Sequence, residues 1–577
     1  ILGSMIQTVA NAEARSTSGM HYTSVPNIMK VIKPLFLDNL RAALTELEER
    51  ADYYIGGGDF SEDHRRKELR QLLPKLDDLL TRIASIKFLD PACGSGNFLI
   101  ITYKELRRLE INILVKQREI REALNEKAVY QGELIADASK ISLSQFSGIE
   151  LDDFAHEVAR LSLYIAEHQM NVEMEEALAD VHPRLLPLRE AGNIVCGNAL
   201  RIDWGTVLNA KADDEVYIFG NPPYIGSKKM TLEQKKELES VICSEISSKK
   251  LDYISGWFYK ATHLIYGKNA QYAFVTTNSI NQGEQVSILW NILLRYGQIS
   301  FAYQSFKWNN SAAHNAGVTV TIIGFSNKND KKRIIYSDKG ESYGKNINPY
   351  LAFADDIIVS NHNDSEKLNN FPKIVFGNMP RSKYLILTND DKNKLVQRYP
   401  ETEVYFKKYI GADEYINGNF RYTIWIDQDE YTKLDKIQEF HQLFENVRQE
   451  RLNSKAAGTR ETASTPWKFV QRGEWDEMFS KGKIEGKFQL LVPAVTSEDR
   501  DYIPMGFVGD DTIISNRCYI VYDTPVWLLG CLVSKMHIKW FQAIGGKLET
   551  RYSYSAGLVY NTFPIPELSE ARKNMLE

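Results

Sequence analysis

The 577-residue chain has few cysteines and no long apolar run. Its five cysteines form no Cys-x-x-Cys pair, which argues against a disulfide framework and a zinc site, and we expect no metal. The most apolar runs, such as 526–533 and 318–325, are far shorter than the roughly 20 residues of a membrane helix. The first residues lack the charged region of a signal peptide. These absences predict a soluble, cytoplasmic protein with no membrane partner.

An excess of charge of either sign is also missing. Seventy Lys and Arg against 75 Asp and Glu leave a net charge of -5, which excludes a uniformly basic nucleic-acid coat but not a local basic groove. A composition of 43% apolar and 25% charged residues excludes a disordered or fibrous chain. At roughly 150 residues per domain, the length predicts two to four domains.

Patterns typical of strands and helices alternate from about residue 20 to 327. Strands are expected at 86–89, 145–149, 192–196, 216–219, 271–276, 299–305 and 318–325, and helices at 26–50, 61–85, 97–127, 154–168 and 253–265. This alternation predicts an α/β fold with a doubly wound, mostly parallel, Rossmann-like sheet. The sequence from Phe371 onward is typical of an irregular α+β domain.

One glycine-rich turn follows a strand and opens a helix. In Phe88-Leu-Asp-Pro-Ala-Cys-Gly-Ser-Gly-Asn-Phe98, Asp90 stands at the strand end, and two glycines would let the backbone approach a ligand closely. Leu99 replaces the third glycine of a dinucleotide fingerprint, and no Gly-Lys-Ser/Thr follows. Glu150 ends the next strand, where a carboxylate can accept hydrogen bonds from ribose hydroxyls. A plain turn and a surface carboxylate are the alternatives.

The segment Ile218-Phe-Gly-Asn-Pro-Pro-Tyr224 predicts a strand that ends in a stiff polar loop. Two prolines fix φ, so the carbonyls of Asn221 and Pro222 are held as acceptors, without a competing N–H from Pro222 or Pro223. Two such acceptors would favour a tetrahedral nitrogen in an aromatic amine and free its lone pair. Tyr224 offers a ring on which an extruded base can stack. A proline turn at a strand end is the alternative.

Together these two motifs resemble the cofactor and catalytic motifs of γ-class N6-adenine DNA methyltransferases. Gly19–Pro26 resembles the upstream motif of these enzymes, and Gly197–Leu200 resembles their third-strand motif, with Asn198 where Asp is frequent. The resemblance implies S-adenosyl-L-methionine as cofactor. The cofactor-binding residues that it implies are Tyr22, Thr23, Asp90, Ala92, Cys93, Gly94, Gly96, Asn97, Phe98, Glu150, Leu151, Asn198 and Ala199.

Further stretches resemble the MmeI-like group of fused restriction–modification enzymes, and the resemblance covers nearly the whole chain. They are 251–253, 278–285, 305–310, 409–418 and 552–564. That group joins a nuclease, a helical connector, a methyltransferase and a target recognition domain in one polypeptide. Only 87 residues precede Phe88, too few for the nuclease and the connector. We therefore expect a C-terminal piece, or a protein without the N-terminal nuclease domain, and double-stranded DNA as partner.

The resemblance and the composition together imply five parts. They are an N-terminal helical segment with the upstream cofactor motif (1–85), the methyltransferase catalytic domain (86–330), a linker (331–370), a DNA target recognition domain (371–552) and a C-terminal segment (553–577).

Several residues are expected to contact DNA. The family's equivalent segment implies that Phe306 or Trp308 sandwiches the flipped base against Tyr224, although Phe306 could instead close the core. Glu549 and Arg551 alternate on an expected extended segment, so they could jointly read one G·C pair. An exposed ion pair is the alternative. Candidates for phosphate contacts, which position rather than specify, are Arg381, Arg460 and Lys468.

The sequence therefore predicts a site-specific DNA methyltransferase that acts on N6 of a flipped-out adenine. In this hypothesis Asn221 and Pro222 hold the amine, which attacks the sulfonium methyl. Two alternatives stay open: a protein-glutamine methyltransferase, which uses the same loop on a side-chain amide, and a non-catalytic DNA specificity module. The long C-terminal half disfavours the first, and the intact Asp90, Glu150 and Asn221 disfavour the second.

Overall fold

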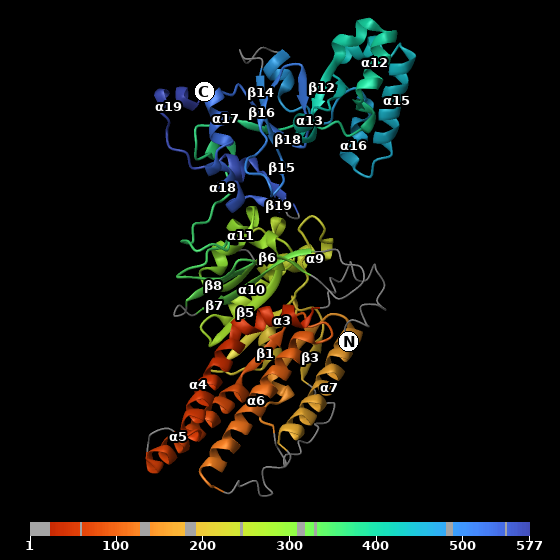
Figure 1. Ribbon diagram of the computed structural model, residues 1–577. Coiled ribbons are helices and arrows are strands. Elements are labelled where there is room, and N and C mark those ends of the chain that lie inside the picture. The colour runs from red at the N-terminus through yellow and green to blue at the C-terminus, as the bar shows by residue number, and fades with distance from the viewer. Residues whose placement is uncertain are drawn as a thin grey trace. The chain divides into compact units, whose positions relative to one another are not determined.

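The computed structural model describes residues 23–57, 61–126, 139–178, 192–242, 246–308, 318–327, 332–480, 488–548 and 551–576. The chain divides into two compact units, one of residues 1–281 and 285–358 and the other of 282–284 and 359–577 (Figure 1). In the part of the chain that is described, no helix has both the length and the apolar character needed to cross a bilayer.

A nine-stranded sheet forms the centre of the first unit, in the order β3-β2-β1-β4-β5-β7-β6-β8-β9. Strands β1 to β5 pair in parallel, whereas β7 runs antiparallel to both of its neighbours. The predicted Rossmann-like, mostly parallel sheet is thereby confirmed. The strands are β1 (Lys87–Asp90), β2 (Phe146–Glu150), β3 (Asn193–Cys196), β4 (Val216–Gly220), β5 (Ala270–Thr277), β6 (Gln298–Trp308), β7 (Val318–Ser326), β8 (Arg333–Ser337) and β9 (Gly340–Gly344).

Helices cover both faces of this sheet (Figure 1). On one face lie α3 (Val25–Ile32), the π-helix η1 (Lys33–Leu37), α4 (Asp38–Ile55), α5 (Glu62–Ser85), α6 (Asn97–Ala123) and α7 (Asp153–Ala177). On the other lie α8 (Trp204–Leu208), α9 (Leu232–Ile242), α10 (Ser255–Ile265) and α11 (Glu284–Leu293).

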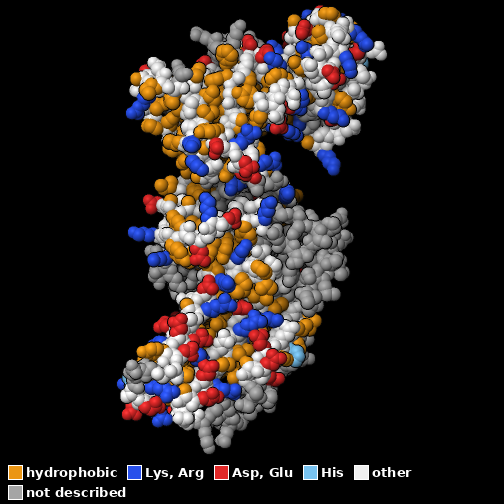
Figure 2. All heavy atoms as spheres, viewed as in Figure 1, with side chains coloured by type: hydrophobic (Ala, Val, Ile, Leu, Met, Phe, Trp, Pro, Cys, Tyr) orange, Lys and Arg blue, Asp and Glu red, His pale blue; other side chains and the backbone are white. Residues whose placement is uncertain are grey.

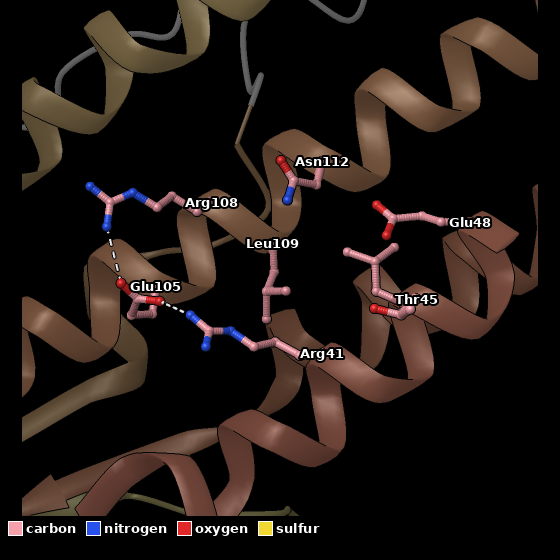
Figure 3. A pocket seen from close by; sticks show the side chains of 8 residues that line it. Arg41, Thr45, Glu48, Glu105, Arg108, Leu109 and Asn112 are labelled. Atoms are coloured by element: carbon pink, nitrogen blue, oxygen red, sulfur yellow. Dashed lines mark hydrogen bonds and ion pairs between the residues drawn. The ribbon is translucent and has the colours of Figure 1, made fainter. Parts of the chain in front are cut away.

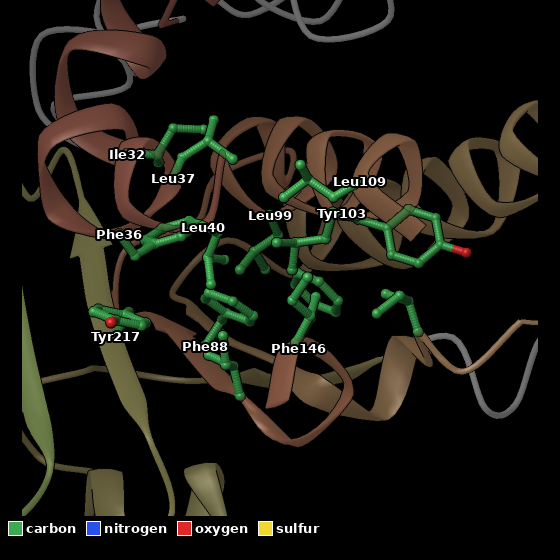
Figure 4. Close-up of a cluster of buried hydrophobic side chains, with 14 of the residues drawn as sticks. Ile32, Phe36, Leu37, Leu40, Phe88, Leu99, Tyr103, Leu109, Phe146 and Tyr217 are labelled. Carbon is green, nitrogen blue, oxygen red and sulfur yellow. The ribbon is translucent and has the colours of Figure 1, made fainter. Parts of the chain in front are cut away.

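Alternation along the strands explains why the sheet has two buried faces. Phe88 and Phe146 stack at 5.1 Å in the core under α3 to α7, where Tyr217 and Leu99 also lie (Figure 4). Leu89, the next residue after Phe88, belongs to the core under α8 to α11. Because successive side chains of a strand point to opposite faces, these apolar runs can fill both cores at once.

Local signals start the helices that frame the sheet ends. The Asp152 carboxylate accepts a hydrogen bond from the Ala155 N–H at 2.8 Å and caps α7. Gly96 takes a left-handed conformation at φ 82° just before α6, where a β-carbon would lie 3.3 Å from the Cα atom of Ala159. The turn after β1 therefore needs glycine both for its backbone angle and for its close approach to α7.

Smaller sheets and short helices make up the second unit. The sheets are β10-β18-β14-β16, β11-β13-β12-β17 and β15-β20-β19. The strands are β10 (Ile374–Phe376), β11 (Ile386–Leu387), β12 (Phe406–Ile410), β13 (Arg421–Ile424), β14 (Phe488–Pro493), β15 (Val495–Thr496), β16 (Gly506–Gly509), β17 (Thr512–Ile514), β18 (Cys518–Tyr522), β19 (Gly546–Leu548) and β20 (Arg551–Ser553). The helices are α12 (Asn389–Arg398), α13 (Ala412–Asn417), α14 (Gln428–Leu434), α15 (Gln438–Leu452), α16 (Ala457–Glu461), α17 (Val526–Leu532), α18 (Lys535–Ile544) and α19 (Glu570–Leu576). The predicted α+β character is confirmed.

The stretch 331–370 differs from the expected linker. Strand β8 pairs with β6 and β9 pairs with β8, so both strands extend the first unit's sheet. The sequence around residues 326–333 is polar and turn-rich, so it gave no signal for β8 and β9. An edge hairpin needs few apolar residues.

Candidate active site

The two motifs meet because their strands are neighbours. The strand order reverses between β1 and β4, and the turn after Asp90 and the loop of Asn221 both follow the carboxyl ends of these strands. In doubly wound sheets such a switch point is where ligands bind. Gly220 ends β4 so close to β1 that a β-carbon there would lie 2.5 Å from the Asp90 Oδ1 atom.

Asp90 is buried, with 1% of its surface exposed. Its Oδ1 atom accepts a hydrogen bond from the Ala92 N–H at 3.1 Å, while Oδ2 has no hydrogen-bond partner among the described residues. Burial raises the pKa of Asp90 to about 8, and the nearby Glu150 carboxylate adds to the rise. A cationic or hydrogen-donating ligand group would satisfy this acceptor.

Glu150 orders the glycine turn from the neighbouring strand. Its carboxylate accepts hydrogen bonds from the Gly94 N–H at 2.7 Å and from the Asp152 N–H at 2.9 Å. Burial raises the pKa of Glu150. Gly94 has φ 55°, and a β-carbon there would meet no atom of the described residues within 4 Å. Asp90, Gly94 and Glu150 thus lie together, as the motifs predict.

The remaining turn residues differ in exposure. Cys93 and Phe98 are buried in the core, with the Phe98 ring 5.8 Å from that of Phe219. The Asn97 amide donates to the Ser95 hydroxyl at 3.2 Å, and Leu151 is 65% exposed.

The upstream motif reaches the loop of Asn221. Thr23 is buried, and its hydroxyl oxygen accepts a long hydrogen bond of 3.5 Å from the Asn221 Nδ2 atom, 198 positions later in the chain. The Asn221 Oδ1 atom is buried and has no hydrogen-bond partner among the described residues. One end of the amide is therefore held while its acceptor oxygen stays available. Tyr22 lies outside the described residues.

Tyr224 stands between the two cores of the first unit, half-buried against both. Burial raises the pKa of its hydroxyl, and a hydrogen bond from the Asn221 side chain partly offsets that rise.

Asp252 ties the loop after Tyr224 to Ser279, a contact that no sequence pattern predicts. Its carboxylate accepts a hydrogen bond from the Ser227 N–H at 3.0 Å and another from the Ser279 hydroxyl. The next residue, Tyr253, donates its N–H to the Ile225 carbonyl at 2.9 Å. The loop just after Tyr224 is therefore tied down twice. The Leu251-Asp-Tyr stretch was noted only as a family resemblance, and its spacing from the proline loop carried no signal of contact.

The loop after β3 is similarly constrained. Asn198 accepts a hydrogen bond from the Leu200 N–H at 2.9 Å and donates one to Glu237 at 3.0 Å. The Ala199 carbonyl accepts from Trp204 Nε1 and from Lys260 Nζ, each at 2.8 Å.

Phe306 packs beside a cation. The Lys30 Nζ atom lies 4.0 Å from the centre of the Phe306 ring, and burial lowers the pKa of this lysine. Trp308 ends β6, and its side chain lies outside the described residues.

Arg381 lines a pocket of about 690 Å³ in the second unit, near Lys383, Arg421 and Arg517. The neighbouring Pro380 carbonyl accepts from the buried Arg451 guanidinium at 2.8 Å. The other two expected phosphate contacts lie outside this pocket lining. Arg460 donates to the carbonyls of residues 454 and 455 at 2.8 and 2.9 Å, and Lys468 is exposed.

The prediction of one extended segment around Arg551 is wrong. Leu548 of β19 pairs with Arg551 of the antiparallel β20, so the chain reverses direction between them. Strict alternation along one strand therefore does not relate Glu549 to Arg551. Glu549 lies outside the described residues, and Arg551 is exposed at the start of β20.

A smaller hollow of about 290 Å³ between α4 and α6 has a different character. Glu105 contacts Arg41 at 2.5 Å and Arg108 at 3.0 Å, so these three of the charged side chains that line it are paired with one another (Figure 3). Figure 2 likewise shows acidic and basic side chains interspersed over the N-terminal helices. We assign no site to this hollow.

Comparison with known proteins agrees with this geometry. Residues 62–337 match the family described as MmeI, DNA-methyltransferase domain, and residues 353–567 match MmeI, target recognition domain. A solved structure of the type IIL restriction–modification enzyme MmeI in complex with DNA is similar with a TM-score of 0.83 and 35% identity, over 99% of this chain and 72% of that one. The chain belongs to the MmeI family.

Two further relatives extend the match. DNA methyltransferase A of Bacillus subtilis (strain 168) is 47% identical over 583 residues, which cover 100% of this chain and 61% of that protein. A putative type II restriction enzyme and methyltransferase of Methanocaldococcus jannaschii is 30% identical over 212 residues, 36% of this chain and 16% of that one. The chain thus spans 61% or less of these two MmeI-like relatives.

Proposed function

We propose that this MmeI-family chain is a site-specific DNA methyltransferase that methylates N6 of a flipped-out adenine. In this proposal it is the modification and recognition portion of a restriction–modification enzyme. The observation that carries the proposal is the buried Oδ1 atom of Asn221, an acceptor without a partner among the described residues, beside Pro222 and Tyr224.

The cofactor in this proposal is S-adenosyl-L-methionine, and the residues present fit it. Asp90 offers a buried acceptor, a β-carbon on Gly94 would meet none of the described residues within 4 Å, and Glu150 is held at the end of β2. Thr23 and the loop of Asn198 and Ala199 would complete the site. When bound, the cofactor supplies a methyl group on a positively charged sulfur.

The protein's own contribution is to prepare the amine. Asn221 Oδ1 and the Pro222 carbonyl would accept the two hydrogens of N6, which favours a tetrahedral nitrogen whose lone pair is free to attack. The amine so prepared would take the methyl group that the cofactor supplies, with the carbon–sulfur bond giving way to the new N–C bond, and N6 would then lose one proton to solvent. No strong general base is required, because the methylated nitrogen is far more acidic than the amine.

Tyr224 is proposed to stack on the flipped adenine, with Phe306 or Trp308 on its other face. Lys30 contacts the Phe306 ring. Which of the two aromatic residues stacks on the base is therefore left to experiment.

The second unit is proposed to read double-stranded DNA. Arg381, Arg460 and Lys468 would contact phosphates, while Arg551 and Glu549 would read a base pair. We also propose a catalytic part of about residues 86–330, preceded by a helical segment, and a recognition part of about residues 371–552, followed by a C-terminal segment.

Tritium-labelled S-adenosyl-L-methionine offered to unmodified plasmid DNA and, separately, to a mixture of proteins tests the proposal. We expect label in DNA, and N6-methyladenine in its nucleoside digest. Asn221→Ala should abolish transfer but keep cofactor binding. Asn291→Ala, on the exposed face of α11, is the matched control. Label in protein alone would favour the glutamine methyltransferase alternative, and DNA binding without any transfer would favour the specificity module.

A further inference from the structure

A hydrogen-bonded cluster lies behind the loop that follows β3. Glu237 of α9 is buried, with 8% of its surface exposed. Its Oε1 atom accepts hydrogen bonds from Asn198 Nδ2 at 3.0 Å and from Arg201 at 2.5 Å, and its Oε2 atom accepts one from the Tyr253 hydroxyl at 2.6 Å. A carboxylate from a helix thus holds the side chain of Asn198.

This contact determines which way the Asn198 amide faces. A carboxylate can only accept, so the atom nearest Glu237 must be the amide nitrogen. The opposite amide atom faces the Leu200 N–H at 2.9 Å, so it must be the oxygen. Both neighbours therefore require the same orientation of the Asn198 amide. In the flipped orientation the amide oxygen would face the Glu237 carboxylate, and the amide nitrogen would face the Leu200 N–H.

The loop of Asn198 lies beside the end of β2. The Gly197 N–H, one residue before Asn198, donates to the Glu150 carbonyl at 2.7 Å. Since Glu150 is expected to bind the ribose, the attached purine would come next to Asn198. The Oδ1 atom keeps a second lone pair, which suits the hydrogen of a 6-amino group.

We propose that Glu237 is a positioning residue for the cofactor: by holding the Asn198 amide, it presents Oδ1 to the purine and selects a 6-amino over a 6-oxo group. The inference rests on the proposed cofactor. It also explains the Asn at a position where Asp is frequent in the resembling family. A carboxylate at 198 would lie against the Glu237 carboxylate, whereas an amide donates to it.

Calorimetric titration with S-adenosylhomocysteine and with S-inosylhomocysteine, which carries a 6-oxo group, tests this without any methyl transfer. We expect wild type to prefer the adenosyl ligand by about tenfold or more, as one mismatched hydrogen bond implies. In Glu237→Ala the amide can turn over, so the preference should fall toward one. Glu233→Ala is the matched control, since it removes another carboxylate that contacts Arg201 at 2.8 Å but leaves Asn198 alone.

A reciprocal exchange tests the pair even if Glu237→Ala folds poorly. Asn198→Asp alone should weaken the adenosyl ligand several-fold at pH 8, because two carboxylates would face each other. Adding Glu237→Gln should restore most of the affinity, since the new amide can donate to the new carboxylate.

Each outcome bears on the inference. An unchanged preference in a folded Glu237→Ala, or a double variant no tighter than Asn198→Asp, overturns the inference alone. Equal weakening of both ligands would show a merely structural role. A wild-type protein that binds neither ligand overturns the proposed cofactor, and the inference with it.

Discussion

Gly220 and Asp90 are interlocked: a β-carbon on Gly220 would stand 2.5 Å from the Asp90 Oδ1 atom. Strand β4, which leads to the loop of Asn221, therefore packs so closely against β1, the expected cofactor strand, that one added carbon does not fit. Any shift of β4 would displace Asp90 as well.

Gly220→Ala should accordingly weaken S-adenosylhomocysteine binding and destabilise the first unit by about 1–3 kcal/mol, the usual result of overpacking. Calorimetry and thermal unfolding measure the two effects. Gly458→Ala is the control, because a β-carbon there would meet no atom within 4 Å in the part of the chain that the structure describes. Normal binding by Gly220→Ala would contradict the tight fit.

The buried Asp90 should make the stability of the ligand-free protein depend on pH. Its pKa is raised from 3.8 to about 8, mainly by burial. Between these values the unfolded chain has lost the proton that the folded chain keeps, so this group's contribution to stability falls as pH rises from about 4 to about 8. Asp90→Asn removes that contribution. The melting temperature of Asp90→Asn relative to wild type should therefore rise across this window, and a difference independent of pH would refute the assignment.

Asp252→Ala should lower kcat at least about tenfold, because the Ser227 N–H in the loop after Tyr224 and the Ser279 hydroxyl each lose their acceptor. Affinity for S-adenosylhomocysteine should stay near that of wild type. Asp252→Asn keeps an acceptor for the Ser227 N–H and should recover most of the rate. Single-turnover methylation at saturating DNA separates this effect from DNA binding. A parallel loss of cofactor affinity and melting temperature would point to misfolding instead.

Arg381 and Arg460 should differ in their effect on DNA affinity. Arg381 lines the cationic pocket, whereas the Arg460 guanidinium already donates to two carbonyls. We expect Arg381→Ala to reduce the slope of log Kd against log salt by about 1, with little change in sequence preference. The slope for Arg460→Ala should change less. Equal slopes for both variants would argue against this distinction.

Much of the first unit could be predicted from the sequence because its signals are local. Apolar runs, a glycine turn and a proline loop predict where β1, β2 and β4 end. Parallel pairing brings those ends together. The family could be named from the same motifs. The glycine turn and the proline loop therefore predicted which residues lie together near Asp90 and Asn221.

The remaining features of the fold and of the site depend on contacts that no local sequence pattern predicts. Glu237 and Asp252 look like ordinary charged residues until the fold places them against Asn198 and Ser227. The hairpin before Arg551 was mistaken for one strand, because three-residue strands are too short to show alternation. Edge strands β8 and β9 were likewise mistaken for a linker.

The hydrogen bond between Thr23 and Asn221 joins positions 198 residues apart. Closing so long a loop is slow compared with forming a helix or a hairpin. During synthesis, β1, β2 and β3 all leave the ribosome before β4, so the strands of the expected cofactor cradle emerge before the amide of Asn221. The expected site then becomes complete only when β4 joins β1, so the loop of Asn221 is the last of its parts to emerge.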